Sequence, residues 1–281
     1  MHRALVLTLV ALFAATCFVA CQKQEFETDE AAVRALVTGD PAHFTSSTAG
    51  DSNENAQMVE DTTMGKWWRV PQTHDSAASI EVQVQGDSAW VGWHQHNYGE
   101  IIHWILTSDT TAAKWTKPLQ EAVQINGIFK REGSDTAAYR GWKLKRISLA
   151  YGRSETTSTV RIDSLRIHSS LRDILIGDPL AAYYHVDSLV AFKPGESLSI
   201  TLYTNATDGY AWLHAFWGSA FVRLPFEDQG SGVFTGTWHA QIVPGFRFAI
   251  FDLMTKSTLM DRSASYDYNG WLLPYRIQTA R

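Results

Sequence analysis

Cysteine is scarce in this chain of 281 residues, which contains only Cys17 and Cys21. Both lie near the N-terminus, so the rest of the chain has no cysteine from which a disulfide could form. A body of this length buries enough apolar surface to be stable without such cross-links. The sequence therefore excludes a small, disulfide-stabilised fold of the secreted type.

A basic cluster is also missing. The formal net charge is −5, and lysine and arginine are spread along the chain. Nucleic-acid binders carry their positive charge on one face, so we expect no nucleic-acid partner. Sharp catalytic or phosphate-binding motifs are absent as well: there is no His-Glu-x-x-His, no Gly-x-Ser-x-Gly, no phosphate loop and no Cys-x-x-Cys. These absences favour a protein without catalytic activity, metal or cofactor.

The N-terminal apolar run, residues 4–15, follows His2 and Arg3 and contains no charge. It is shorter than the roughly 20 residues that a permanent membrane span requires. A short basic start, an apolar run and small residues after it are typical of a cleaved export signal.

The four residues that follow resemble the lipobox of bacterial lipoproteins. Phe18, Val19, Ala20 and Cys21 have the order apolar, β-branched, small, cysteine, although leucine is usual at the first place. An ordinary secretory cleavage site would need a small residue instead of Phe18. The resemblance implies a signal peptide over 1–20, palmitate-type acylation of Cys21, a lipidated tether over 21–27, and a place in the bacterial cell envelope. The outer membrane or cell surface is favoured over the inner membrane, and an unlipidated secreted protein is the alternative.

The first half of the body has a helical start and then strands. Thr28 caps a helix that we expect to end at Gly39, and a second, weaker helix is expected over 54–68. Alternation from residue 79 predicts a hairpin through Gly86 and Asp87, with further strands over 101–106, 123–131 and 138–149. The closing segments GIFKREG (127–133) and YRGWKLKRIS (139–148), in this order of elements, resemble the NTF2-like, SnoaL-type cone. The resemblance implies an α+β domain over 28–151, in which a helix covers a curved antiparallel sheet.

The second half reads as all-β. After a polar stretch at 152–158, strand-like runs are expected at 160–167, 189–192, 197–203, 211–216, 221–226, 233–238, 247–253 and 272–277, with turn-forming residues between them. The segment FKPGESLSITLYTN (192–205) resembles an entry strand of immunoglobulin-like domains. It implies a seven- to eight-stranded β-sandwich over 159–281.

One strand of the first half carries a row of candidate binding residues. Trp90, His94, His96 and Tyr98 have the same parity, so their side chains share one face, while Ala89, Val91 and Trp93 face the other way. The two imidazoles would bind a transition metal only if a third ligand, for example His103, came near. The plain interpretation is that they are polar members of a half-buried sheet. Gln95 and Asn97 continue the apolar side, which leaves a change of face in mid-strand open.

Two residues of the predicted closing strand, Arg140 and Trp142, are the other candidates, because side chains on such a face line the cavity of a cone. Packing in the core is the competing interpretation for Trp142. In the second half, we expect the aromatic residues to pack in the core or at a domain interface, while one exposed indole would stack on a sugar. They are Trp212, Phe216, Trp217, Trp238 and Trp271.

The sequence as a whole predicts a membrane-tethered, non-catalytic module that binds a ligand or a protein. A cell-surface glycan-binding protein is the first alternative, and a small-molecule enzyme that uses the cone cavity is the second.

Overall fold

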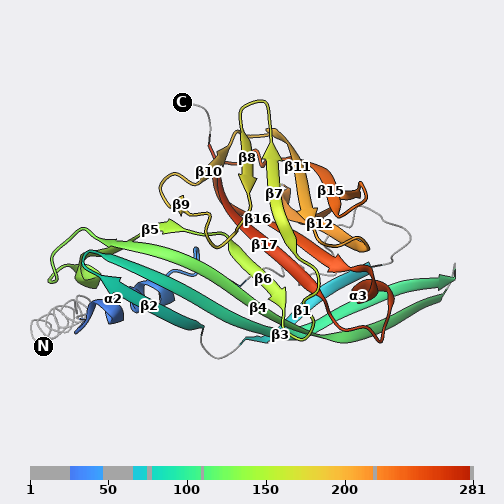
Figure 1. Cartoon of the computed structure of the whole chain (residues 1–281), viewed down its shortest axis with the longest axis horizontal. Coiled ribbons are helices and arrows are strands. Elements are labelled where there is room, and N and C mark those ends of the chain that lie inside the picture. Colours follow the sequence, from blue (N-terminus) through green and yellow to red (C-terminus); the bar gives the residue numbers. More distant parts are fainter. Residues whose placement is uncertain (1–25, 47–65, 75–77, 109–110, 218–219, 279–281) are drawn as a thin grey trace, which may run out of the picture.

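The computed structural model describes residues 26–46, 66–74, 78–108, 111–217 and 220–278. Strands dominate these residues, which form a large curled sheet and a smaller second sheet (Figure 1). The first half contains α2 (Asp29–Thr38), β1 (Lys66–His74), β2 (Ser79–Gln85), β3 (Ser88–Ser108), β4 (Thr111–Arg131), the 3-10 turn η1 (Ala138–Gly141), β5 (Trp142–Ile147) and β6 (Ala150–Ser154).

The second half adds short strands and one short helix. They are β7 (Ile162–His168), β8 (Asp173–Ile176), β9 (Tyr184–His185), β10 (Val190–Phe192), β11 (Ser197–Thr204), β12 (Gly209–Trp217), β13 (Ala220–Pro225), β14 (Glu227–Asp228), β15 (Val233–His239), β16 (Gly245–Thr255), α3 (Lys256–Met260) and β17 (Tyr268–Ile277). Neither helix among the described residues is long and apolar enough to cross a membrane.

The longest elements are β3 and β4, which contain 21 residues each and pair antiparallel along their whole length. Strand β2 precedes them, and it turns into β3 through Gly86 and Asp87, where Gly86 has the positive φ of 57° that this tight turn requires. The paired strands extend well beyond the body of the molecule at one end (Figure 1). They form the frame on which the candidate site lies.

Strands from both halves of the chain build the large sheet, whose main order is β1-β3-β4-β6-β17-β16-β12-β13. The two halves join where β6 pairs antiparallel with β17. The sheet curls so far that its two ends approach each other, since Arg223 of β13 donates a hydrogen bond from Nη1 to the carbonyl oxygen of Trp67 on β1 at 3.1 Å. Its guanidinium also lies 3.5 Å from the centroid of the Trp67 ring.

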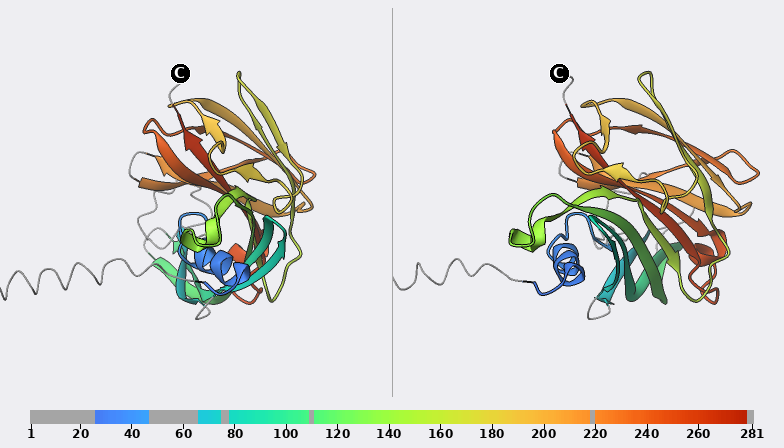
Figure 2. Two further views of the ribbon diagram at one scale, coloured as in Figure 1. Left: turned by 90° about the vertical axis from the view of Figure 1, so that its left-hand side faces the viewer. Right: turned by 60° about the vertical axis from the view of Figure 1, so that its left-hand side comes forward.

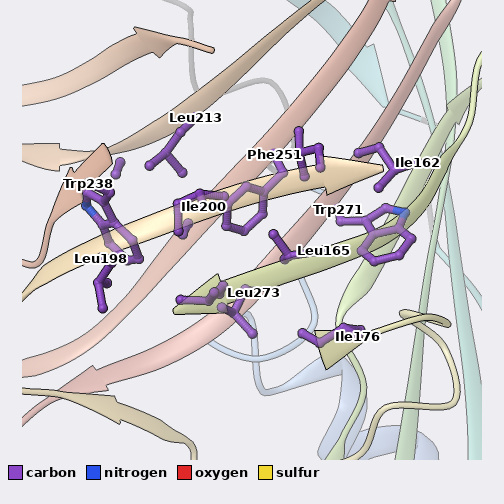
Figure 3. Close-up of a cluster of buried hydrophobic side chains, with 14 of the residues drawn as sticks. Ile162, Leu165, Ile176, Leu198, Ile200, Leu213, Trp238, Phe251, Trp271 and Leu273 are labelled. Atoms are coloured by element: carbon purple, nitrogen blue, oxygen red, sulfur yellow. The ribbon is translucent and has the colours of Figure 1, made fainter. Parts of the chain in front are cut away.

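The second sheet, with the order β14-β15-β11-β7-β8, faces the part of the large sheet that comes from the second half. Between the two sheets lies a core of aliphatic and aromatic side chains, with Trp238 and Trp271 among its largest members (Figure 3). Alternation explains why these residues meet. In β11, for example, Leu198, Ile200 and Leu202 are fully buried while their neighbours face solvent.

A second core lies under α2, on the inner side of the curved first half (Figure 2). The helix presents Ala32, Val33 and Val37 to Trp93, Phe129 and other buried residues of the sheet. Thr28 caps it as expected, because its Oγ1 accepts a hydrogen bond from the backbone N–H of Ala31 at 3.1 Å. The predicted first helix is therefore confirmed.

The predicted fold class is wrong. The molecule is not an α+β NTF2-like cone followed by an immunoglobulin-like sandwich, because most of its described residues lie in strands and one sheet runs through both halves. The first half has a single helix among its described residues, and its sheet is completed by β17, β16, β12 and β13 from the second half. A sandwich-like pair of sheets is present, but the curled sheet shared by both halves replaces the separate cone.

Most of the individual strands are confirmed. The runs expected in the second half correspond to β7, β10, β11, β12, β13, β15, β16 and β17. The segment expected as a strand over 138–149 instead begins with the turn η1 before β5. The second helix, expected over 54–68, lies mostly outside the described residues, and residues 66–68 belong to β1. The predicted signal peptide, Cys21 and most of the tether also lie outside them. The predicted division at residues 152–158 stays a prediction, and the large sheet continues across it.

Candidate functional site

The outer face of the β2–β3–β4 sheet carries the row of candidates that the alternation predicted. Trp90, His94, His96 and Tyr98 alternate along β3 with residues that are buried on the inner face. The alternation continues without a change of face, since Gln95 and Asn97 are buried like Val91 and Trp93 before them. One face of β3 is therefore fixed by packing, and the other remains accessible.

Trp90 is the most exposed member of this row, with 41% of its surface accessible. It pairs across the sheet with Gln83 of β2 and Ile128 of β4. A hollow of about 550 Å³ lies beside it, lined by Gln83, Val84, Gln85 and Trp90. The indole next to the amide groups of Gln83 and Gln85 provides both an apolar platform and hydrogen-bonding partners for a ligand.

The two histidines do not form a metal site. The Nδ1 atom of His96 contacts the carboxylate of Glu155, which follows β6, and His94 pairs with Ser79 and Gln124 across the sheet. His103, the third ligand considered, faces the opposite side of β3, where its ring stacks on Trp115 with centroids 3.6 Å apart. Burial lowers the pKa of His103 to about 3. Within the described residues, no group of three His, Cys, Asp or Glu side chains is placed to hold a metal ion.

Arg140 and Trp142 are not brought to this surface. Trp142 is buried in the core under α2, and its indole N–H donates to Asp29 Oδ1 at 3.1 Å. Arg140 donates from Nε to the same oxygen at 2.8 Å, and Arg131 also pairs with Asp29. Burial raises the pKa of Asp29, but these hydrogen bonds outweigh it, so that the pKa lies below its ordinary value. In this position the two candidates hold the first turn of α2 against the sheet.

The backbone at this contact is unusual. Tyr139 and Arg140 have positive φ angles of 48° and 53°, a region that side chains with a Cβ rarely occupy. Both side chains contact the segment that leads into α2: Tyr139 stacks on Phe26 with centroids 5.4 Å apart, and Arg140 reaches Asp29 and the Phe26 carbonyl. The docked helix thus compensates a locally unfavourable conformation.

Sequence reasoning missed a cluster of buried charged and phenolic groups inside the curled sheet. Arg69 of β1 donates from Nη1 to Asp252 Oδ2 of β16 at 2.8 Å, and its Nε lies 3.8 Å from Glu121 Oε1 of β4. His214 of β12 places Nε2 2.8 Å from the same Asp252 oxygen. Tyr266 donates from its hydroxyl to Glu121 Oε1 at 2.5 Å. These groups join strands from the two halves of the chain.

Burial determines the electrostatics of this cluster. It raises the pKa of Glu121, and the Arg69 cation and the Tyr266 hydroxyl offset only part of the increase. It lowers the pKa of Arg69, but the charge of Asp252 outweighs this effect, and the pKa lies well above the ordinary value. The ring of Tyr268 lies 4.5 Å from the Arg69 guanidinium, and Gly270 leaves the space that the Tyr268 hydroxyl occupies.

The cluster is closed to solvent. Arg69, Glu121, His214, Asp252 and Tyr268 have no accessible surface, so a dissolved ligand does not reach them without opening the sheet. Its ion pairs and hydrogen bonds connect strands on opposite sides of the curled sheet. One signal in the sequence pointed to it: Asp252 interrupts the apolar run of residues 248–254, and a charge inside such a strand must be paired.

The aromatic residues singled out in the second half are mainly core residues. Trp212, Trp238 and Trp271 are buried, as expected, whereas the side chains of Phe216 and Trp217 lie outside the described ones. These three indoles are therefore not available for stacking on a sugar.

No protein-family model matches the chain, and neither the curated proteins nor the solved structures contain a significant match.

Proposed function

We propose that this protein is a membrane-tethered, non-catalytic binding module of the bacterial cell envelope, and that its ligand surface is the outer face of β2 and β3 around Trp90. The observation that carries the proposal is the exposed indole beside a hollow, on a strand whose other face is packed. Fixed backbone support and an accessible apolar platform favour binding, because little conformational entropy is lost when the ligand arrives.

The tether is supported by the N-terminal sequence. The lipobox-like residues end at Cys21, the only thiol outside the expected signal segment, and few residues separate it from α2. Several acyl chains on one cysteine would anchor the protein stably in a membrane. In cells fed a fatty-acid analogue, we expect label on the full chain and none on the Cys21→Ala variant. Equal labelling of the two proteins would contradict the tether.

The ligand surface is tested by comparing two exposed tryptophans on the same strand and the same face. Trp90 borders the hollow, whereas Trp104 lies toward the other end of β3 and is 46% accessible. Arrays of cell-envelope glycans and a library of short displayed peptides serve as probes. We expect Trp90→Ala to lose binding and Trp104→Ala to keep it, with both variants folded like the original. Equal binding by Trp90→Ala and the original protein would refute the proposed surface.

A glycan is the second candidate ligand, and one observation favours it. Gln83 and Gln85 place amide groups beside the accessible Trp90 ring. Stacking on an indole with flanking amide hydrogen bonds is a common way to hold a sugar ring. The enzyme alternative has less support, because the titratable cluster described above is enclosed in the sheet.

A further inference from the structure

Strand β2 is an edge strand with little protection. Among the described residues its only strand partner is β3, and the pairing runs from Ser79 to Gln85 without a bulge. Edge strands are usually protected by lysine, proline, a bulge or a covering element, because their open backbone groups pair with other chains. The sequence SIEVQVQ has neither lysine nor proline. In Figure 1 no other coloured strand lies alongside β2 on its outer side.

The register shows which backbone groups point outward. Gln85 and Ser88 close the tight turn at Gly86 and Asp87, and such a closing pair exchanges hydrogen bonds. Bonded and non-bonded pairs alternate along an antiparallel ladder, so the backbone groups of Val84, Val82 and Ile80 point away from β3. One contact supports this assignment independently: the Arg34 guanidinium of α2 donates to the carbonyl oxygen of Ile80.

The rest of the outward edge is open among the described residues. Arg34 occupies only the Ile80 end, and no backbone hydrogen bond joins Val82 or Val84 to a described residue outside the β2–β3 pair. The two residues together offer two N–H donors and two carbonyl acceptors at the repeat of an extended chain. Next to them lies the hollow with Trp90 and with Val84, whose accessible fraction is 38%.

We infer that β2 binds an extended peptide segment of a partner protein, which adds a strand along Val82–Val84 and places an apolar side chain in the hollow beside Trp90. This inference rests on the proposed function and names its ligand class. Only a polypeptide carries donors and acceptors at the spacing of this edge, which distinguishes it from a sugar that needs the hollow alone. Main-chain bonds supply affinity and the pocket supplies selectivity in this mode of recognition.

The test uses the full chain and a displayed library of short linear peptides. In an extended peptide, the N–H groups of successive residues point to opposite edges of the strand. The best binder is therefore synthesised in two forms, each N-methylated on the amides that point to one of these edges. A strand added to β2 uses only one edge of the peptide. We therefore expect one form to lose at least about tenfold in affinity and the other to bind like the parent.

A pair of protein variants tests the same contact from the other side. Val84→Pro removes an outward N–H without removing a bond to β3, whereas Val84→Thr keeps the N–H and the size of the side chain. We expect Val84→Pro and Trp90→Ala to lower the affinity for the peptide about tenfold, and Val84→Thr to bind the peptide as tightly as the original protein does. Far-ultraviolet circular dichroism confirms that each variant is folded. The N-methylated peptides give the answer without any variant if Val84→Pro does not fold.

Three results would overturn the inference. They are a library without any binder that depends on Trp90, equal loss of affinity in both N-methylated forms, and Trp90-dependent binding of glycans alone. The last result leaves the proposed function standing with a sugar as ligand. By contrast, binding of peptides and glycans that is unaffected by Trp90→Ala would refute the proposed surface as well.

Discussion

Replacing Arg69 tests whether the buried cluster holds the curled sheet together. Arg69→Met keeps an apolar chain of similar length but removes the only cation that contacts both Asp252 and Glu121 among the described residues. His214 remains 2.8 Å from Asp252, while Glu121 keeps the hydrogen bond from the Tyr266 hydroxyl. Leaving a buried charge without its partner typically costs about 3–5 kcal/mol of folding free energy. We expect a loss in this range near neutral pH, measured by urea denaturation.

The loss should depend on pH in a defined direction. Burial already raises the pKa of Glu121, and Arg69→Met removes the cation that lowers it. A carboxyl group whose pKa is higher in the folded than in the unfolded state is stabilised by protonation, so its destabilising effect decreases as the pH falls through the folded-state pKa. The difference between Arg69→Met and the original protein should therefore be smaller at about pH 5 than at about pH 7.

A second arginine–aspartate pair provides the control. Arg166 and Asp173 form an ion pair on the outer side of the second sheet, and both side chains are about half accessible. An exposed pair contributes only about 0–1 kcal/mol, so Arg166→Met should leave stability nearly unchanged. If Arg69→Met costs no more than Arg166→Met, or if its cost grows on acidification, the buried cluster does not hold the curled sheet together.

Three further changes test other parts of the structure. His103 is neutral in the folded state, so the free energy of unfolding should decrease as the pH falls from about 6.5 toward about 3, by at most about 1.4 kcal/mol per pH unit. His103→Phe should flatten this slope. Lys117 donates from Nζ to the carbonyl oxygens of three residues in and after α3. Lys117→Met should therefore lower the free energy of unfolding by about 1–3 kcal/mol in urea melts. Lys114 lies on the same strand but is exposed, so Lys114→Met should cost less than about 0.5 kcal/mol. A fragment of residues 159–281 keeps nearly all of the core between the two sheets but loses β6, the partner of β17. We expect this fragment to give a β-type circular dichroism spectrum and a lower melting temperature than the full chain. A spectrum without strand signal would mean that the two halves fold only together.

Local patterns predicted the elements that have one polar and one apolar face. The hairpin at Gly86 and Asp87, the helix capped by Thr28 and most strands of the second half are of this kind. In each case the apolar side chains repeat with the period of the helix or strand. The residues against which the element packs either lie nearby in the sequence or belong to the general hydrophobic core. Such information is present in a short segment of sequence.

The extent of β3 and β4 could not be predicted in the same way. The segment 111–122 belongs to β4, but its inner face carries Lys117 and Glu121, and Pro118 lies between them. Alternation of apolar and polar residues is lost there, because these buried polar groups find their partners on α3, β1 and the segment before β17. Local sequence patterns also do not predict the pairing of β6 with β17, since it joins residues that are more than a hundred positions apart. This long-range pairing is why a local resemblance to a cone gave the wrong fold class.

The two faces of β3 explain why a binding surface is expected at Trp90 rather than in the interior. On the inner face, side chains from Ala89 to His103 are fixed by the core under α2, by the stacked Trp115 and by the closed cluster around Arg69. These contacts hold the backbone of β3 and, through the ladder, that of β2. The outer face and the free edge of β2 are then presented in one conformation, with no contribution of their own to the core. A ligand that meets such a preformed edge loses less entropy than one that must order a loop, so substitutions at Trp90 should change affinity while leaving the fold intact.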